Sequence, residues 1–161
     1  MIGALIMVHG DDNGLVLPPK IAPKQIVIAT IRNDENVLKV ASEIESKLKA
    51  CGHRVILDTS DKSAGFKFAE YEMKGVPLRI EIGPRDIANG NVVFARRDNG
   101  EKETVKIEDI TDKVAKVLEL IQKNMYDKAL KHTNERTYTC TDLEEVKKIM
   151  YSKPGFIKAM W

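Results

Sequence analysis

The spacing of apolar residues changes along the chain, and each change marks an expected element. Residues 25–31 (QIVIATI) form a nearly continuous apolar, β-branched run, which is typical of a strand buried on both faces. Asn33 and Asp34 then offer caps for a helix whose apolar positions recur at helical spacing up to Gly52. Residues 53–58 (HRVILD) are the next expected strand. This strand–helix–strand order predicts a parallel pair of strands with a right-handed crossover.

The middle of the chain continues the alternation. Residues 65–75 (GFKFAEYEMKG) predict a shorter helix that ends at Gly75. Strands are expected at 77–83 (PLRIEIG) and 91–97 (NVVFARR), and a weaker one at 103–108 (ETVKIE). The predicted fold class is therefore α/β: a mixed sheet of five strands flanked by about three helices, followed by a helical extension.

Further segments flank this region on both sides. Residues 1–23 start with an apolar stretch and pass through LPPKIAP, whose three prolines predict a semi-rigid connector. Residues 110–136 predict a long amphipathic helix, and Thr141 and Asp142 start another. The apolar segment outside the connector, and the end at Trp161 without a terminal cap, both suggest a piece cut from a longer protein.

Composition narrows the class of protein. Hydrophobic residues make up 43% and charged residues 31%, as in an ordinary globular domain. The net charge of +2 is too small to indicate a nucleic-acid binder by itself, so any basic surface must be local. The longest apolar run, residues 2–8, is too short to span a bilayer. Cys51 and Cys140 are isolated, which predicts a reduced, cytoplasmic protein.

Charged residues gather around one expected strand. In residues 78–82 (LRIEI) they alternate with apolar ones, Gly83 and Pro84 end the run, and Arg85 and Asp86 follow on an expected turn. Taken alone, this pattern favours a solvated strand face and an ordinary turn over contact with RNA. The chain has no GxGxxG or Walker loop, so a nucleotide-binding enzyme is poorly supported.

Two longer stretches carry a family resemblance. Residues 2–23 (IGALIMVHGDDNGLVLPPKIAP) and 65–105, which contain KGVPLRIEIGPRD, resemble prolyl-tRNA synthetases of the branch shared by archaea, eukaryotes and some bacteria. That family joins a class II catalytic core to an anticodon-binding domain and then to a zinc-binding domain. The resemblance implies that residues 1–23 are the tail of the core and a connector. Residues 24–126 would be the anticodon-binding domain, and 127–161 a helical extension toward an absent zinc-binding domain.

The resemblance also implies a function. The parent enzyme would ligate proline to its tRNA with ATP and magnesium, with zinc in the missing domain, and would form a homodimer through its catalytic core. This piece would recognise the anticodon loop of proline tRNA and would be inactive alone, without catalytic residues, metal ligands, cofactor or membrane partner. It would be monomeric, or would associate through exposed apolar residues, which are Ile2, Leu5, Ile6 and Leu15.

By position, the resemblance assigns contacts with anticodon bases to charged residues of the central region. These residues are Glu72, Arg79, Arg85, Asp86 and Lys102. It places Arg96 and Arg97, as a secondary assignment, near the RNA backbone. A proline anticodon carries two guanines. A carboxylate can accept both N–H donors of a guanine edge, and a guanidinium matches O6 and N7, so two guanines require both residue types.

Other interpretations stay open. The same fold could belong to a non-enzymatic accessory protein that binds RNA, and a small α/β enzyme acting on phosphorylated metabolites ranks below both. Residues 9–12 (HGDD) contain metal-ligand types, but a loop at a helix end is the better interpretation. Phe66, Phe68 and Tyr71 share one helix; some should be core and one could stack on a base.

Overall fold

The computed structural model describes residues 1–32 and 34–159, so the expected cap at Asn33 lies outside the described residues. The chain forms two compact units, residues 1–122 and 123–161. We had expected the boundary of the main domain at residue 126, with residues 1–23 as a separate part. None of the helices among the described residues is long and apolar enough to cross a membrane.

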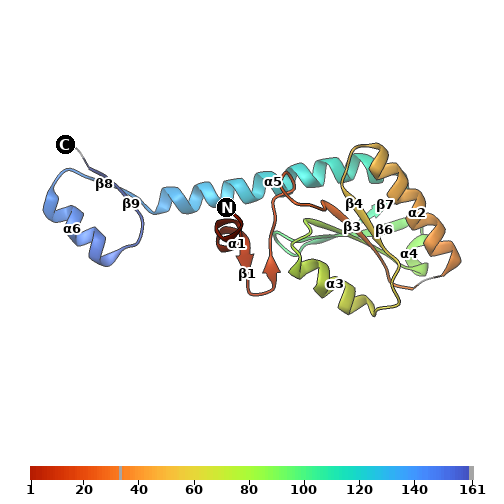
Figure 1. The fold of residues 1–161 in the computed structure, drawn as a ribbon. Helices are drawn as coiled ribbons and strands as arrows, with labels where there is room; N and C mark the ends of the chain where they lie inside the picture. The colour runs from red at the N-terminus through yellow and green to blue at the C-terminus, as the bar shows by residue number, and fades with distance from the viewer. Residues whose placement is uncertain (33, 160–161) are drawn as a thin grey trace. The chain divides into compact units, whose positions relative to one another are not determined.

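The first unit is built on a five-stranded mixed sheet (Figure 1). Its strands, in spatial order, are β4 (Val55–Asp58), β3 (Ile26–Thr30), β5 (Leu78–Ile82), β6 (Asn91–Arg96) and β7 (Lys102–Lys106). β3 pairs in parallel with β4 and β5, whereas β5, β6 and β7 pair antiparallel. The predicted mixed α/β sheet of five strands is confirmed.

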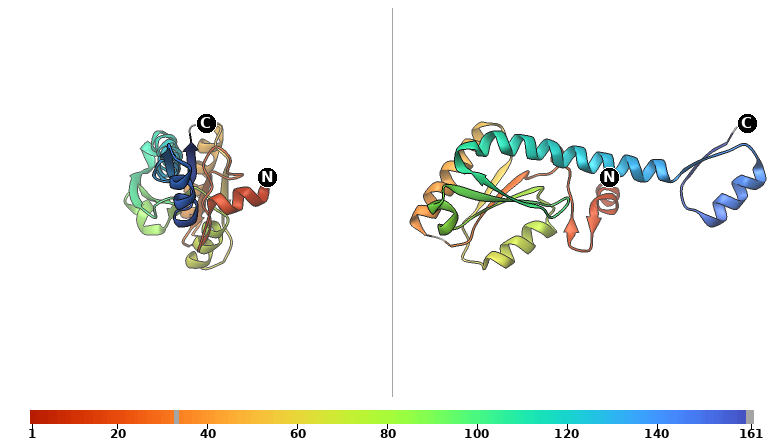
Figure 2. Two further views of the ribbon diagram at one scale, coloured as in Figure 1. Left: turned by 90° about the vertical axis from the view of Figure 1, so that its left-hand side faces the viewer. Right: turned by 180° about the vertical axis from the view of Figure 1, so that it is seen from behind.

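Helices cover both faces of this sheet. α2 (Glu35–Ala50) connects β3 to β4, and α3 (Ala64–Met73) connects β4 to β5. The first crossover runs from β3 to β4, and the second runs from β4 back past β3 to β5, so they move across the sheet in opposite directions. Because such crossovers are right-handed, their helices lie on opposite faces. The views agree: α2 and the first part of α5 (Ile110–Glu135) lie on one face and α3 on the other (Figures 1 and 2).

Strand β5 separates an apolar face from a charged one. Leu78, Ile80 and Ile82 are fully buried and point to one side. Side chains alternate along a strand, so Arg79 and Glu81 point to the other side. The guanidinium of Arg79 lies over the ring of Phe68 in α3. The charged face of β5 is therefore the α3 side of the sheet.

The expected turn at Arg85 and Asp86 is wrong, because these residues lie in a short helix, α4 (Pro84–Ala88). Proline fixes the backbone angle that the first helical residue needs. The carboxylate of Asp86 accepts the backbone N–H of Gly83 at 3.0 Å, which satisfies a free donor at the start of the helix. This capping therefore stabilises a short helix at the position where the sequence predicted a turn.

The remaining elements are mostly short. α1 (Ile2–His9) leads into a hairpin of β1 (Gly10–Asp11) and β2 (Gly14–Leu15), and a 3-10 turn (Ile107–Asp109) precedes α5. In the second unit, β8 (Thr137–Cys140) pairs in parallel with β9 (Phe156–Ala159) around α6 (Leu143–Ser152). Neither two-stranded sheet is predicted from the sequence, because strands of two to four residues are too short to show an alternation of apolar and polar positions.

Candidate nucleic-acid interface

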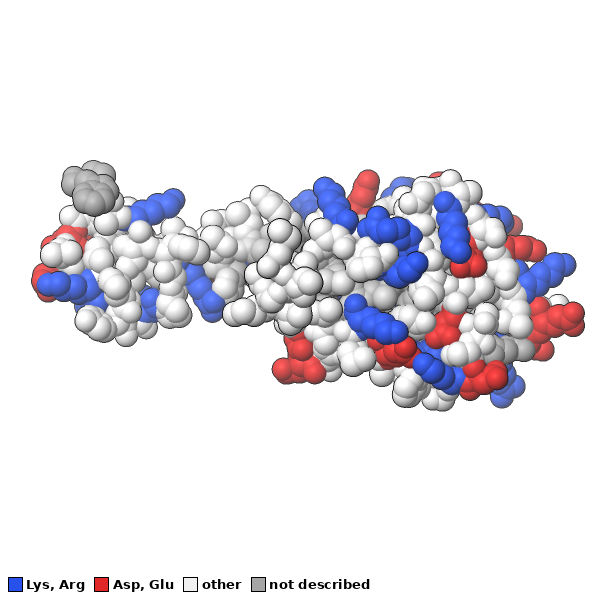
Figure 3. Space-filling model, in the orientation of Figure 1, with Lys and Arg blue, Asp and Glu red and all other residues white. Residues whose placement is uncertain are grey.

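A polar cleft of about 460 Å³ opens on the first unit. One wall is the hairpin, with Asp11 and Asn13, and another is the end of α3 with Glu72. The floor and rim come from Arg79 of β5 and from residues 95–102 around the β6–β7 turn. Lysines and arginines are interspersed with aspartates and glutamates over the surface of this unit (Figure 3).

A buried carboxylate organises the cations of the cleft. Glu81 is 6% exposed, and its Oε1 lies 3.1 Å from Nε and 3.0 Å from Nη2 of Arg79. Nζ of Lys102 lies 3.0 Å from the same oxygen and 3.2 Å from Oε2. Charge-assisted hydrogen bonds of this kind restrict the rotation of both cationic side chains. Glu81 therefore fixes the side chains of Arg79 and Lys102 from a buried position. The expectation that Glu81 lies on a solvated strand face is wrong.

Phe68 supplies an aromatic surface beside these cations. Its ring centroid lies 4.3 Å from the guanidinium carbon of Arg79 and 5.7 Å from Nζ of Lys102. Tyr71, by contrast, is buried, and Phe66 is 57% exposed. The sequence predicted that these aromatic residues have different roles but could not assign them. The structure places Phe68 beside the charged residues of the cleft.

Glu72 lines the cleft. Among the described residues, neither oxygen of its carboxylate has a hydrogen-bond or ion-pair partner, whereas its backbone carbonyl accepts Nε–H of Arg97 at 3.1 Å. The backbone of Glu72 is thus fixed while its carboxylate stays unoccupied. An ionised carboxylate in this setting can accept two N–H donors from a ligand.

Arg96 and Arg97 border the same cleft but are engaged within the protein. Arg96 binds Asp98 through two hydrogen bonds of 2.7 and 3.0 Å, and this interaction raises the pKa of Arg96 above its ordinary value. Arg97 binds Asp11 at 2.6 Å, and that hydrogen bond lowers the pKa of Asp11. Both guanidiniums therefore shape the walls of the cleft.

Arg85 and Asp86 lie elsewhere on the unit. They belong to α4, which follows the C-terminal end of β5, whereas Arg79 is near the strand's N-terminal end. At about 3.3 Å per residue, the four residues from Arg79 to Gly83 span about 13 Å. The structure therefore brings together Glu72, Arg79 and Lys102 and leaves Arg85 and Asp86 outside this cleft. Arg85 is exposed, and one oxygen of Asp86 is used in capping.

Sequence reasoning did not assign Glu81, Phe68 and Asp11 to the site. Glu81 is two residues from Arg79, the spacing that places two side chains on one face of a strand, and that signal could have identified it. Phe68 precedes Glu72 by four residues, which places both on one helix face. Asp11 carries no comparable signal, because it reaches the cleft through a hairpin 86 residues away from Arg97.

Comparison with known proteins agrees with this geometry. A family of domains described as "Anticodon binding domain" matches residues 25–117. The chain belongs to this anticodon-binding domain family.

The relatives of this anticodon-binding domain are longer proteins. It is 53% identical to "Proline--tRNA ligase" from Clostridium botulinum (strain Loch Maree / Type A3) and 50% identical to the protein of that name from Lachnoclostridium phytofermentans. The protein of that name from Lachnospira eligens is 49% identical. Each alignment covers 100% of this chain and 34% of the relative. The chain thus spans about a third of the length of the curated relatives it matches.

The described residues do not fit the metal sites that such an enzyme implies. Over residues 1–32 and 34–159 no three histidine, cysteine, aspartate or glutamate side chains are grouped so that they could hold a metal ion. The His9–Asp12 segment, expected as a loop, contributes Gly10 and Asp11 to strand β1 instead.

Proposed function

We propose that this chain is the part of a proline–tRNA ligase that recognises the anticodon of proline tRNA. One observation carries the proposal: the cleft places the open carboxylate of Glu72 beside Arg79, which Glu81 and Phe68 hold in place. RNA recognition by sequence uses unstacked loop bases, which are read by hydrogen bonds at their edges and by stacking on their faces. The cleft offers hydrogen-bonding groups of both kinds, donors and acceptors, and the Phe68 ring lies next to its cations.

The charges of the cleft favour base edges over phosphates as ligands. Cations and carboxylates alternate around it, whereas a phosphate-binding surface needs an excess of cations. A guanine can donate its two Watson–Crick N–H groups to Glu72, while its O6 and N7 accept from Arg79 or Lys102. We therefore assign one anticodon guanine to this cleft.

The second guanine would lie at the other end of β5. Arg85 is exposed there. In the next residue, Asp86, one carboxylate oxygen is used in capping and the second is not. These two residues repeat the combination of a guanidinium and a carboxylate, about 13 Å away along the strand. Contacts of Arg96 and Arg97 with the RNA backbone stay a prediction, and their ion pairs with Asp98 and Asp11 weigh against it.

The parent enzyme would carry out the chemistry outside the described residues. It would join proline to tRNA with ATP and magnesium, in the cytoplasm, as a homodimer through its catalytic core, and zinc would belong to another domain. The relatives matched over the whole chain bear the name of a ligase, and that favours this context over an accessory protein. We expect the 161-residue chain alone not to exchange pyrophosphate into ATP with proline.

A filter-binding titration tests the proposal. The full chain is titrated with proline tRNA and with the same tRNA in which both anticodon guanines are replaced, across a salt series. We expect tighter binding of the unmodified tRNA at every salt concentration. Equal binding of the two tRNAs would reduce the interaction to nonspecific attraction and would contradict the proposal.

A further inference from the structure

The face of α3 that packs on the sheet combines polar groups with the ring of Tyr71, which packs with Val27 and Val76. Among the described residues of this helix, only Lys67 and Tyr71 are buried, one turn apart. Lys67 is 1% exposed and is among the largest fully buried side chains of the chain. A helix usually packs on a sheet through an apolar stripe. A lysine and a tyrosine in that place require a specific set of polar partners.

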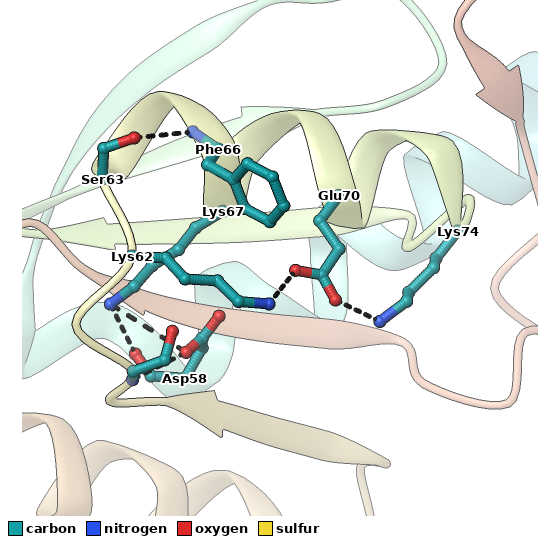
Figure 4. Close-up of polar contacts among 8 residues, drawn as sticks. Asp58, Lys62, Ser63, Phe66, Lys67, Glu70 and Lys74 are labelled. Atoms are coloured by element: carbon teal, nitrogen blue, oxygen red, sulfur yellow. Dashed lines mark hydrogen bonds and ion pairs between the residues drawn. The ribbon is translucent and has the colours of Figure 1, made fainter.

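Lys67 joins the ends of two strands. Its Nζ donates to the carbonyl oxygen of Thr30 at 3.1 Å, to Oγ1 of Thr30 at 3.2 Å and to the carbonyl oxygen of Asp58 at 3.3 Å. It also forms an ion pair of 3.9 Å with the Asp58 carboxylate. Figure 4 shows this ammonium pointing down from α3 toward Asp58. Thr30 and Asp58 are the last residues of β3 and β4.

Asp58 also holds Tyr71. The Tyr71 hydroxyl donates to the Asp58 carboxylate, and the Asp58 Oδ1 accepts the backbone N–H of Ser60 at 2.9 Å. Burial, together with this hydrogen bond, raises the pKa of Tyr71 to about 12, so the hydroxyl keeps its proton near neutral pH. Asp58 thus contacts two residues that lie one turn apart on α3.

Each of these helix residues directly precedes a residue of the site: Phe68 lies against Arg79 beside the cleft, and Glu72 lines the cleft, as Tyr71 itself does. Phe68 follows Lys67, and Glu72 follows Tyr71. Successive residues of a helix are turned by about 100°, so fixing one face fixes the direction of the next. Apolar contacts are not directional, whereas hydrogen bonds have defined distances and angles. Polar contacts at Lys67 and Tyr71 therefore set both the rotation and the axial position of α3.

We propose that Lys67, Tyr71 and Asp58 are positioning residues for anticodon recognition. They hold α3 in the orientation that places the Phe68 ring against Arg79 and the Glu72 carboxylate at the cleft. The assignment to anticodon recognition rests on the proposed function, whereas the placement of Phe68 and Glu72 does not.

The outer face of α3 provides a matched control. Glu70 binds Lys62 at 2.7 Å and Lys74 at 2.6 Å, and both lysines are about half exposed (Figure 4). These pairs are also made by a carboxylate of α3 and lysine ammonium groups, which come from residues just before and just after the helix, but they face solvent. Glu70→Gln weakens both of them without touching the buried contacts.

The first test measures the position of Phe68 without RNA. In the full chain, Lys67→Met keeps the length of the side chain and removes its ammonium group. The Arg79 Nε–H signal in an NMR spectrum reports the nearby Phe68 ring, because a ring shifts the resonances of protons above its face. We expect this ring-induced shift in the unmodified chain and in Glu70→Gln, and its loss in folded Lys67→Met. An unchanged shift in folded Lys67→Met would overturn the proposal.

The second test measures discrimination. The ratio of affinities for proline tRNA and for the tRNA with both guanines replaced should fall about tenfold in Lys67→Met and stay unchanged in Glu70→Gln. A stabilising role alone would leave this ratio intact below the melting temperature. If Lys67→Met does not fold, Tyr71→Phe removes one hydroxyl group only, and it should lower the ratio by a smaller factor. An unchanged ratio in a folded variant would overturn the proposal.

The two tests separate the inference from the function. If the unmodified chain does not distinguish the two tRNAs, the proposed function fails. The placement of Phe68 by Lys67 is then decided by the NMR signal alone. If the unmodified chain distinguishes them and Lys67→Met does so equally well, the inference fails and the function stands.

Discussion

The carboxylate of Glu81 holds the guanidinium of Arg79 two residues before it on the same face of β5. Because Glu81 is 6% exposed and the Arg79 side chain 16% exposed, water competes little for this contact. Lys102 reaches the same carboxylate from β7, but its side chain is 53% exposed. Arg79 is therefore the more tightly held of the two cations.

Glu81→Gln should destabilise the first unit. The substitution removes the charge that Arg79 faces and weakens hydrogen bonds that contribute more than neutral ones, so we expect a loss of about 2 kcal/mol in the free energy of unfolding. Urea unfolding measures it. Glu103→Gln is the control, because its ion pair with Lys113 is about half exposed on both sides and should contribute little. Equal losses in the two variants would contradict the supporting role of Glu81.

Glu72→Gln should change specificity more than general affinity for RNA. An amide has one acceptor and one donor group where the carboxylate has only acceptors, so the two N–H donors of a guanine can no longer both be satisfied. We expect discrimination between the guanine-containing and guanine-replaced tRNAs to fall by about 1–3 kcal/mol. The slope of log affinity against log salt should stay unchanged, because Glu72 binds no phosphate. Titrations at several salt concentrations measure both quantities, and a changed slope with intact discrimination would refute the assignment.

Acid should weaken the contacts of Asp58. Burial alone would raise the pKa of this carboxyl group, but hydrogen bonds from Ser60 and Tyr71 and the charge of Lys67 outweigh it, so the pKa lies below its usual value. A carboxyl group with a lower pKa in the folded chain stabilises the fold above its unfolded pKa of about 3.9, and this contribution disappears as the pH falls further. Urea midpoints measured from neutral pH downward should therefore fall more steeply below about pH 4 in the unmodified chain than in Asp58→Asn. Parallel curves would contradict this.

Arg97→Lys should loosen the hairpin at residues 10–15. One guanidinium serves both the carbonyl oxygen of Glu72 and the carboxylate of Asp11, and an ammonium group lacks the planar fork to reach both. The backbone bond from Val16 N–H to His9 O, 2.6 Å long, closes the hairpin and should exchange its proton faster in the variant. Hydrogen exchange followed by NMR measures this rate. Unchanged exchange at Val16 would show that Arg97 does not hold the hairpin.

Alanine substitutions at Gly75 and Gly52 separate the cost of a steric clash from the cost of backbone strain. Both have positive φ, +71° and +84°, but a Cβ atom at Gly75 would lie 2.6 Å from Cβ of Leu15, whereas one at Gly52 would meet nothing within 4 Å. We expect Gly52→Ala to cost about 1 kcal/mol in the free energy of unfolding, and Gly75→Ala about 2 kcal/mol more. Thermal or urea unfolding measures both. Equal costs would show that the hairpin shifts freely.

The strands of the large sheet could be predicted because their residues carry the pattern. The run at 26–30 is apolar on both faces, and residues 78–82 alternate, so burial alone selects the strand. The parallel pairing of β3 with β4 followed from the strand–helix–strand order of the sequence. The hairpin and the pair of β8 and β9 could not be predicted, because strands this short show no period, and β8 also pairs with a strand on the far side of α6.

The chemistry of the cleft was predictable only in part. Glu72, Arg79 and Lys102 were singled out by resemblance, and the structure brings them together. Burial of Glu81 and of Lys67 was not predictable, because a charged residue in a sequence is usually on the surface. The partners that permit burial, such as Thr30 for Lys67, come from other strands.

Because the hairpin forms one wall of the cleft, the smallest part of the chain with a complete cleft must include the hairpin. Asp11 and Asn13 border the cavity, yet both precede the first residue of the matched domain, Gln25. A protein trimmed to residues 25–117 would lose one side of the cleft. Affinities measured on such a shortened protein would underestimate recognition, and the missing part would be the side that Arg97 fastens.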